Sequence, residues 1–349
     1  MDATWDANLS DEPRAILFGC GGERLSAEER AFFAAADPVG FVLFRRNCQS
    51  PDQVRALVDE MRAVAGRADA PVLVDQEGGR VARLQPPHWR RYPAPAALAA
   101  LPRAEEAVRL GARLIAEDLA ALGITVDAAP VLDVPVPGAD LVIGDRAYAG
   151  DPATVIRLGR AVCEGLLAGG VLPIVKHMPG HGRARVDSHI ALPVVDESEE
   201  ELTTTDFVPF RALADMPWAM TAHVVYSAID AERPATLSPR LIDRVIRGAI
   251  GFDGVLASDD IGMGALRGSI AERVAGALSA GCDVVLHCNG TLDEMHEAAD
   301  AARPITPRTA ARLARAEAMR RAAQRDFDRA AAETRFDALI GVGERSVTG

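Results

Sequence analysis

Short runs of apolar, β-prone residues recur along the chain, and most are continuously hydrophobic rather than alternating. Such runs are typical of strands buried on both faces, with helices on one side and a packed barrel interior on the other. The eight runs lie at residues 15–18, 40–44, 71–75, 124–128, 172–177, 218–223, 254–258 and 283–287.

Segments with apolar residues at helical spacing lie between these runs, for example 51–64, 104–122 and 151–168. Two of them begin with proline at the first helical position, after Ser50 and after Asp151. Alternating strands and helices indicate a parallel α/β architecture. Eight repeats of the unit predict a closed (β/α)8 barrel of the TIM type.

The last part of the chain, residues 307–340, is rich in alanine, arginine and glutamate. This composition predicts a solvated outer helix, or a pair of helices, that closes the barrel. There is no internal repeat, low-complexity linker or break in composition that would mark a second domain. We therefore predict a single catalytic barrel over residues 1–349, with 304–349 as closing C-terminal helices.

Composition and charge narrow the classes of function. The chain has 349 residues, of which 49% are hydrophobic and 25% charged, and its formal net charge is −12. That charge repels phosphate backbones, so we expect no nucleic-acid partner. There is no apolar span of 18 residues, and residues 1–15 are acidic where a secretory signal is basic and apolar, so we expect no membrane association and a cytoplasmic location. Five cysteines without C-x-x-C spacing indicate reduced thiols.

Unusual polar residues follow the ends of four predicted strands. They are 75–80 after the third strand, 176–182 after the fifth, His223 at the end of the sixth and 258–260 after the seventh. In a β/α barrel, catalytic groups lie on the loops beyond the carboxyl ends of the strands. The sequence therefore predicts that four loops converge on one cavity.

Three histidines, His177, His181 and His189, lie close together and raise the question of a metal site. Proline and glycines interrupt the segment, and no H-E-x-x-H arrangement is present. We therefore expect no metal and no other cofactor. Instead, we expect Lys176 and His177 to donate hydrogen bonds to ligand hydroxyl groups.

Asp187 and His189 are two residues apart, so the carboxylate can bond one imidazole nitrogen and leave the other facing the substrate. A histidine titrates near neutral pH, where its acid and base forms are both accessible. The pair is therefore a candidate proton-transfer dyad, on a loop whose glycines supply flexibility.

Asp259 and Asp260 emerge together at the end of a buried strand. Adjacent side chains on a strand point in different directions, so only one of the two faces the mouth of the barrel. Residue spacing alone leaves open which one does. It also leaves open whether that carboxylate is a nucleophile, a metal ligand or a helix cap.

Seven motifs occur in a characteristic order: G-F-V-L-F-R-R-N at 40–47, D-Q-E-G-G-R-V-A-R at 75–83, A-P-V-L-D-V at 129–134, I-G-D-R-A-Y at 143–148, K-H-M-P-G-H-G at 176–182 with D-S-H at 187–189, M-T-A-H-V at 220–224, and S-D-D-I-G-M at 258–263. Together they span nearly the whole chain. The set resembles bacterial β-N-acetylglucosaminidases of glycoside hydrolase family 3, the branch that acts in peptidoglycan recycling.

The resemblance implies that Asp259 is the nucleophile, that His189 is the acid/base and that Asp187 orients it. It also implies a sugar-binding set, which consists of Asp75, Arg83, Arg146, Lys176 and His177. Two features depart from the family pattern: Met178 stands where the family commonly has phenylalanine, and residues 19–22 deviate from the usual early motif. Neither touches a catalytic role, although Met178 is expected to reshape the pocket wall slightly.

The function implied is a retaining exo-β-N-acetylhexosaminidase that removes terminal N-acetylglucosamine from muropeptides or anhydro-muramyl disaccharides. The expected partner is a small sugar; the oligomeric state is open, a monomer being one option. A phosphorylase is an alternative, because a neutral histidine base repels phosphate less than a carboxylate does. A β-glucosidase of the same family is a second alternative, although such relatives usually carry a second domain that supplies the acid/base. A barrel that senses amino sugars without turnover is the non-enzymatic alternative.

Overall fold

The structure is a computed structural model that describes residues 12–341. The two ends of the predicted single domain, 1–11 and 342–349, lie outside the described residues. The same holds for most of the acidic N-terminal segment and for the end of the predicted closing segment. Within the described part, no helix is both long and apolar enough to cross a bilayer.

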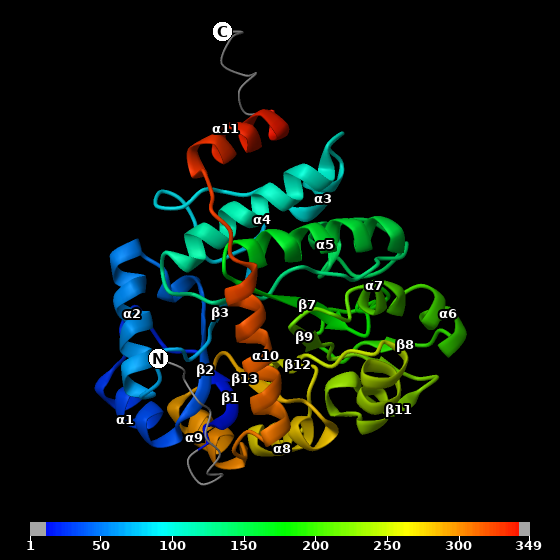
Figure 1. Cartoon of the computed structure of the whole chain (residues 1–349). Helices are drawn as coiled ribbons and strands as arrows, with labels where there is room; N and C mark the ends of the chain where they lie inside the picture. The colour runs from blue at the N-terminus through cyan, green and yellow to red at the C-terminus, as the bar shows by residue number, and fades with distance from the viewer. Residues whose placement is uncertain (1–11, 342–349) are drawn as a thin grey trace.

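Eight parallel strands form a closed barrel, in the order β1-β13-β12-β9-β7-β6-β3-β2 (Figure 1). The barrel strands are β1 (Arg14–Phe18), β2 (Pro38–Leu43), β3 (Val72–Val74), β6 (Val126–Asp127), β7 (Leu172–Met178), β9 (Trp218–Thr221), β12 (Val255–Asp260) and β13 (Val284–His287). Each overlaps one of the eight apolar runs, and the prediction of a (β/α)8 barrel is confirmed. The strands are almost entirely buried, as expected when both faces are covered.

Helices follow the strands and cover the outside of the barrel (Figure 1). They are α1 (Ala27–Ala36), α2 (Pro51–Val64), α3 (Pro95–Ala99), α4 (Ala104–Ala120), α5 (Pro152–Ala168), α6 (Glu199–Thr204), α7 (Phe207–Ala212), a π-helix η4 (Leu241–Ala249), α8 (Ile270–Ala280) and α9 (Leu292–Ala301). Short 3-10 turns are η1 (Arg45–Asn47), η2 (Gly144–Arg146) and η3 (Ala235–Leu237). The two helix starts predicted at proline are correct: Ser50 and Asp151 cap α2 and α5 by accepting backbone N–H groups.

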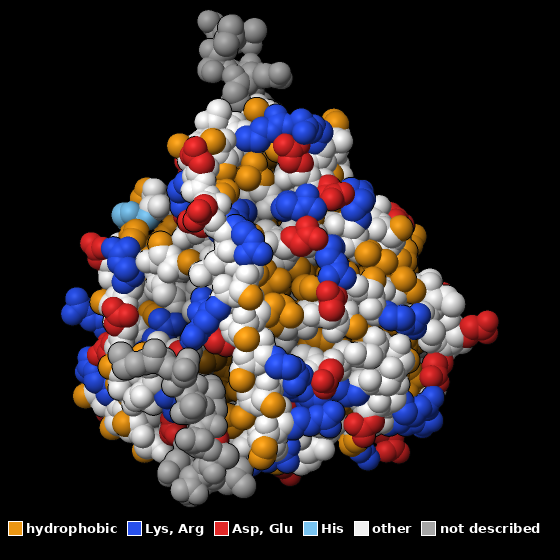
Figure 2. Space-filling view, in the orientation of Figure 1, with side chains coloured by type: hydrophobic (Ala, Val, Ile, Leu, Met, Phe, Trp, Pro, Cys, Tyr) orange, Lys and Arg blue, Asp and Glu red, His pale blue; other side chains and the backbone are white. Residues whose placement is uncertain are grey.

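Two further helices, α10 (Pro307–Ala323) and α11 (Arg329–Ile340), make up the alanine-rich C-terminal stretch. Helix α11 packs over α4 at the opposite end of the molecule from α8 and α9 (Figure 1). Phe336 is fully buried there against Gly111, where a Cβ atom would approach its ring to 2.9 Å. Figure 2 shows acidic and basic side chains interspersed over this face, and several are ion pairs within one helix, such as Arg321 with Glu317.

Within residues 12–341, five short strands lie outside the barrel, and none of them was predicted. Strands β8 (Val194–Val195), β10 (Val225–Tyr226) and β11 (Asp230–Pro234) form one small sheet, and β4 (Gln76–Gly78) pairs with β5 (Val81–Ala82) in another. Four of them, all but β11, have only two or three residues, which is too short a pattern to be recognised in sequence. Both sheets shape the loops that follow barrel strands.

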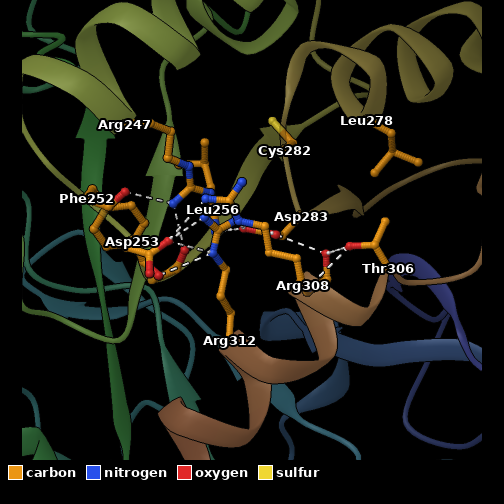
Figure 3. Close-up of polar contacts among 12 residues, drawn as sticks. Arg247, Phe252, Asp253, Leu256, Leu278, Cys282, Asp283, Thr306, Arg308 and Arg312 are labelled. Carbon is orange, nitrogen blue, oxygen red and sulfur yellow. Dashed lines mark hydrogen bonds and ion pairs between the residues drawn. The ribbon is translucent and has the colours of Figure 1, made fainter. Parts of the chain in front are cut away.

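Asp283 connects the amino ends of β12 and β13 to helix α10 (Figure 3). Its carboxylate, 4% exposed, accepts from the backbone N–H of Leu256 at 2.9 Å, from Arg247 at 2.8 Å and from Arg312 at 2.9 Å. Arg312, which lies on α10, also donates to Asp253 at 2.6 Å. The charge cluster therefore holds α10 against the amino-terminal end of the barrel.

Replacing Arg312 with methionine is expected to lower the free energy of unfolding by about 3 kcal/mol, because it removes one partner from a buried ion pair. The matched control is Arg308→Met: the Arg308 side chain is 74% exposed and lies 3.7 Å from the same Asp253. An exposed pair contributes at most about 1 kcal/mol. Urea unfolding of both variants checks this, and equal losses would contradict the stabilising role of Arg312.

Candidate active site

A cavity of about 670 Å³ opens at the carboxyl ends of the barrel strands. All eight residues singled out from the sequence line it: Asp75, Arg83, Arg146, Lys176, His177, Asp187, His189 and Asp259. They come from the carboxyl ends of β7 and β12 and from the loops after β3, β6 and β7. The convergence of distant loops on one cavity is thus found, while the roles of these residues stay predictions.

Lys176, at the end of β7, is the centre of an ionic network on the cavity floor. Its Nζ lies 2.9 Å from Asp75 and 2.6 Å from Glu77. Arg83 bonds Asp75 at 2.9 Å, and Arg146 bonds both oxygens of Glu77 at 2.8 and 2.9 Å. Burial alone would raise the pKa of both carboxyls, but the adjacent cations hold each pKa below its usual value. Both carboxylates are therefore acceptors at neutral pH.

His177 is held in place by Asp133, which is fully buried. The Nδ1 atom of His177 lies 2.7 Å from the Asp133 carboxylate, which also accepts from the backbone N–H of His177 at 3.2 Å and of His181 at 2.6 Å. Burial would raise the pKa of Asp133, but the two histidines lower it. Its charge makes His177 a donor at Nδ1 and leaves Nε2 for the cavity.

Asp259 and Asp260, at the end of β12, have different partners. Asp260 accepts from the backbone N–H groups of Gly262 at 2.9 Å and Cys288 at 3.1 Å, so it supports the neighbouring loops. Asp259 accepts only from the backbone N–H of Asp260, at 2.8 Å, among the contacts of residues 12–341. Burial opposes its ionisation, but the neighbouring His223 and His177, the bond from the backbone N–H of Asp260 and the charge of Lys176 bring its pKa below the usual value. An ionised carboxylate with little hydrogen bonding is suited to nucleophilic attack.

Asp187 and His189 form the hydrogen-bonded pair that their spacing predicted. The Nδ1 atom of His189 lies 2.7 Å from Asp187 Oδ1, which also accepts from the backbone N–H of His189 at 2.8 Å. The Asp187 side chain is 31% exposed and that of His189 62% exposed. Burial would raise the pKa of Asp187, but its bonds to His189 lower it. The dyad therefore stands at the cavity mouth with Nε2 of His189 free to face a ligand.

His223 differs from the expectation of a fourth converging loop: it is fully buried and does not line the cavity. Its ring nitrogens lie 2.7 Å from Thr236 Oγ1 and 2.9 Å from the carbonyl oxygen of Asp260. Its bond to the carbonyl oxygen of Asp260 supports the end of β12. Met178 is likewise buried and does not line the cavity, so it does not form the pocket wall directly.

Sequence reasoning missed two residues that organise the site, Glu77 and Asp133. Glu77 stands two residues after Asp75, the spacing at which extended residues share a side, and this signal was available. Asp133 follows an apolar run as Asp75 and Asp259 do, but nothing in its spacing identifies His177 as its partner.

Asp127, at the end of β6, is a second buried carboxyl behind the cavity floor. Its Oδ1 accepts from the backbone N–H of Gln76 at 2.9 Å, while Oδ2 has no hydrogen-bond partner among residues 12–341. Burial raises its pKa from 3.8 to about 7. The folded protein therefore retains a proton that the unfolded chain loses, and stability falls as pH rises between these values.

Replacing Asp127 with asparagine keeps the acceptor for Gln76 and removes the titration. Between pH 3.8 and about 7, the free energy of unfolding of the wild type is expected to fall, relative to that of the variant, by about 1.4 kcal/mol for each pH unit. Urea unfolding at a series of pH values measures it. A difference that stays constant with pH would show that Asp127 is ionised in the folded protein.

No group of three or more His, Cys, Asp or Glu side chains within residues 12–341 is arranged to hold a metal ion. The three histidines of the 177–189 segment instead bond to Asp133, Ser188 and Asp187. The chemistry of the described cavity is therefore built from carboxylates, cations and imidazoles.

Comparison with known proteins identifies the family. The model of the family described as "Glycosyl hydrolase family 3 N terminal domain" matches residues 14–317. The chain belongs to glycosyl hydrolase family 3. The family resemblance drawn from the motifs is thereby confirmed.

Similar proteins match most of the chain. The β-hexosaminidase of Alkalilimnicola ehrlichii is 42% identical over 283 residues, covering 78% of this chain and 80% of that protein. NagZ from Neisseria gonorrhoeae, solved in complex with N-trifluoroacetyl-D-glucosamine, is 33% identical with a TM-score of 0.83, over 94% of this chain and 98% of that one. A family 3 β-N-acetylglucosaminidase from Paenibacillus sp. is also 33% identical, with a TM-score of 0.81 over 90% of this chain, which spans 62% of that longer protein.

Proposed function

We propose that this family 3 chain is a retaining exo-β-N-acetylhexosaminidase that removes a terminal, non-reducing N-acetylglucosamine through a covalent glycosyl-enzyme intermediate. One observation carries the proposal: a partly buried carboxylate with a lowered pKa, Asp259, and a carboxylate–imidazole dyad, Asp187–His189, line the same cavity. The 42% identity to a β-hexosaminidase supports the preference for an amino sugar.

In the first step, a carboxylate oxygen of Asp259 attacks the anomeric carbon while His189, as imidazolium, protonates the leaving oxygen. Asp187 stabilises the imidazolium through its 2.7 Å bond to Nδ1 and directs Nε2 at the leaving group. In the second step, neutral His189 takes a proton from water, whose oxygen attacks the anomeric carbon and releases Asp259. Two inversions at that carbon give retained configuration.

The floor of the cavity supplies the sugar-binding groups. Asp75 is proposed to accept hydrogen bonds from ring hydroxyls, and the cationic groups to donate to other hydroxyls and around the 2-acetamido group. The donors are Arg83, Arg146, Lys176 and His177. Their mutual ion pairs keep them charged and oriented before the sugar arrives, which lowers the reorganisation needed for binding.

The proposed natural substrates are muropeptides or N-acetylglucosaminyl-anhydro-muramyl disaccharides, and the proposed role is peptidoglycan recycling. The peptidoglycan-recycling motifs support this, as does the N-acetylglucosamine analogue bound to the relative from Neisseria gonorrhoeae. We propose the cytoplasm as the compartment, since all five cysteines are buried free thiols, which suits a reducing environment.

The decisive experiment compares 4-nitrophenyl N-acetyl-β-glucosaminide with 4-nitrophenyl β-glucoside. We expect clear preference for the acetamido sugar; preference for the glucoside would support a β-glucosidase instead. Product analysis on N-acetylglucosaminyl-anhydro-N-acetylmuramic acid, with and without phosphate, then identifies the acceptor. Free N-acetylglucosamine in both cases supports the hydrolase, and N-acetylglucosamine 1-phosphate indicates a phosphorylase. Sugar binding without product from any of these substrates would indicate a sensor.

A further inference from the structure

The loop that carries the dyad is anchored to the barrel through its middle residue. Between residues 185 and 190, Ser188 alone is buried, and it is 3% exposed. The side chains on either side of it, Asp187 and His189, are 31% and 62% exposed. The position of the dyad over the cavity therefore depends on what Ser188 contacts.

Ser188 contacts the loops after β7 and β12. Its Oγ lies 3.1 Å from Nε2 of His181, and its carbonyl oxygen accepts from the backbone N–H of Ala265 at 3.2 Å. Ala265 lies on the loop that follows Asp259. At the neighbouring Gly264, a Cβ atom would lie 2.8 Å from the carbonyl oxygen of His189, so the absence of a side chain allows the two loops to approach closely.

Contacts with Asp133 and His177 fix the position of His181. Its backbone N–H donates to Asp133 at 2.6 Å, and its ring meets the ring of His177 edge-on at 5.7 Å. Burial lowers the pKa of His181 to about 4, so the ring is neutral at neutral pH. Its Nδ1 has no hydrogen-bond partner within residues 12–341, so Ser188 is the one polar contact of the ring there.

We propose that His181 and Ser188 are positioning residues for catalysis: their contact holds the Asp187–His189 dyad over Asp259, in reach of the leaving oxygen. The inference rests on the proposed function, in which His189 is the acid/base. Through Asp133 and His177, the same contact ties the exposed acid/base loop to the sugar-binding floor of the cavity. Catalytic groups that are misplaced by about 1 Å lose on the order of 100-fold in rate.

The test replaces Ser188 with alanine and compares two substrates that differ in leaving group. On methyl N-acetyl-β-glucosaminide, which needs protonation of a poor leaving group, we expect kcat/KM, which reports the step in which the leaving group departs, to fall about 100-fold. On the activated 2,4-dinitrophenyl N-acetyl-β-glucosaminide, the loss is expected to be below about 10-fold, because departure of that group needs little acid catalysis. A purely structural role would slow both substrates equally, and that result, or no loss on either, would overturn the proposal.

Two variants of His181 test the contact from its other side. His181→Phe keeps a buried ring without the hydrogen bond and is expected to reproduce the pattern of Ser188→Ala. His181→Gln places a polar atom near the position of Nε2 and should restore most of the lost rate. In the double variant Ser188→Ala/His181→Phe, the loss should not exceed that of either single variant, since both remove one contact. Additive losses would overturn the assignment of these two residues as partners.

Ser50→Ala is the matched control. It removes a serine hydroxyl that accepts a backbone N–H at the start of α2, away from the cavity, so it should leave the ratio of the two substrates unchanged. Measurements on the wild-type protein and on His189→Ala distinguish failure of the proposed function from failure of the positioning role. If the wild type hydrolyses neither substrate, the proposed function fails. If His189→Ala shows the leaving-group dependence and both Ser188→Ala and His181→Phe lack it, only the positioning role fails.

Discussion

Replacing Asp259 with asparagine is expected to abolish turnover of aryl N-acetyl-β-glucosaminides, with kcat falling on the order of 10⁴-fold or more, as when a covalent nucleophile is removed. Binding of N-acetylglucosamine should persist, because the floor residues Asp75 and Lys176 keep their own partners. Steady-state kinetics with 4-nitrophenyl N-acetyl-β-glucosaminide measures the first effect, and titration calorimetry with the free sugar the second.

Asp260→Asn is the matched control for this result. The variant amide keeps an oxygen that can accept from Gly262 and Cys288, so the loops around the strand end remain supported. We expect it to retain most of the activity. If Asp260→Asn abolishes turnover and Asp259→Asn does not, the nucleophile has been assigned to the wrong member of the pair.

Replacing His189 with alanine is expected to slow hydrolysis of substrates with poor leaving groups by roughly 100- to 10,000-fold, the usual contribution of general acid catalysis. The side chain is 62% exposed, so its removal leaves no buried cavity and should hardly change stability. An activated aryl glycoside should lose far less in its first step. The values of kcat/KM on methyl and 2,4-dinitrophenyl N-acetyl-β-glucosaminides report this first step, and an equal loss of kcat/KM on both would rule out His189 as the acid.

Asp187→Asn separates orientation from charge in the same dyad. The amide can still accept from the backbone N–H of His189, but it no longer carries the charge that stabilises the imidazolium. We expect a loss in the same direction as that of His189→Ala, and smaller.

The barrel could be predicted from the sequence because its strands are buried on both faces. In the run 172–177, the first four residues are continuously apolar, as a strand between the barrel interior and the helices requires, and its strand, β7, was predicted to within one residue. The short strands β8 and β10 were missed because two residues carry no periodic pattern. His223 was placed at the cavity because it follows an apolar run, whereas the barrel strand ends two residues earlier, at Thr221.

The eightfold alternation, the loops that carry chemistry and the Asp187–His189 pair could be predicted from the amino-acid pattern, because each depends on neighbours in the chain. How those loops meet follows from packing between segments far apart in the chain. Glu77 and Lys176 lie far apart in sequence and 2.6 Å apart in space. Asp260 accepts from the backbone N–H of Cys288, just after β13, and Asp259 does not, a difference that their neighbouring positions in the chain do not reveal. The link from Ser188 to His181 likewise requires the loop to fold back on β7, because hydrogen-bond partners across loops follow from packing and not from local propensity.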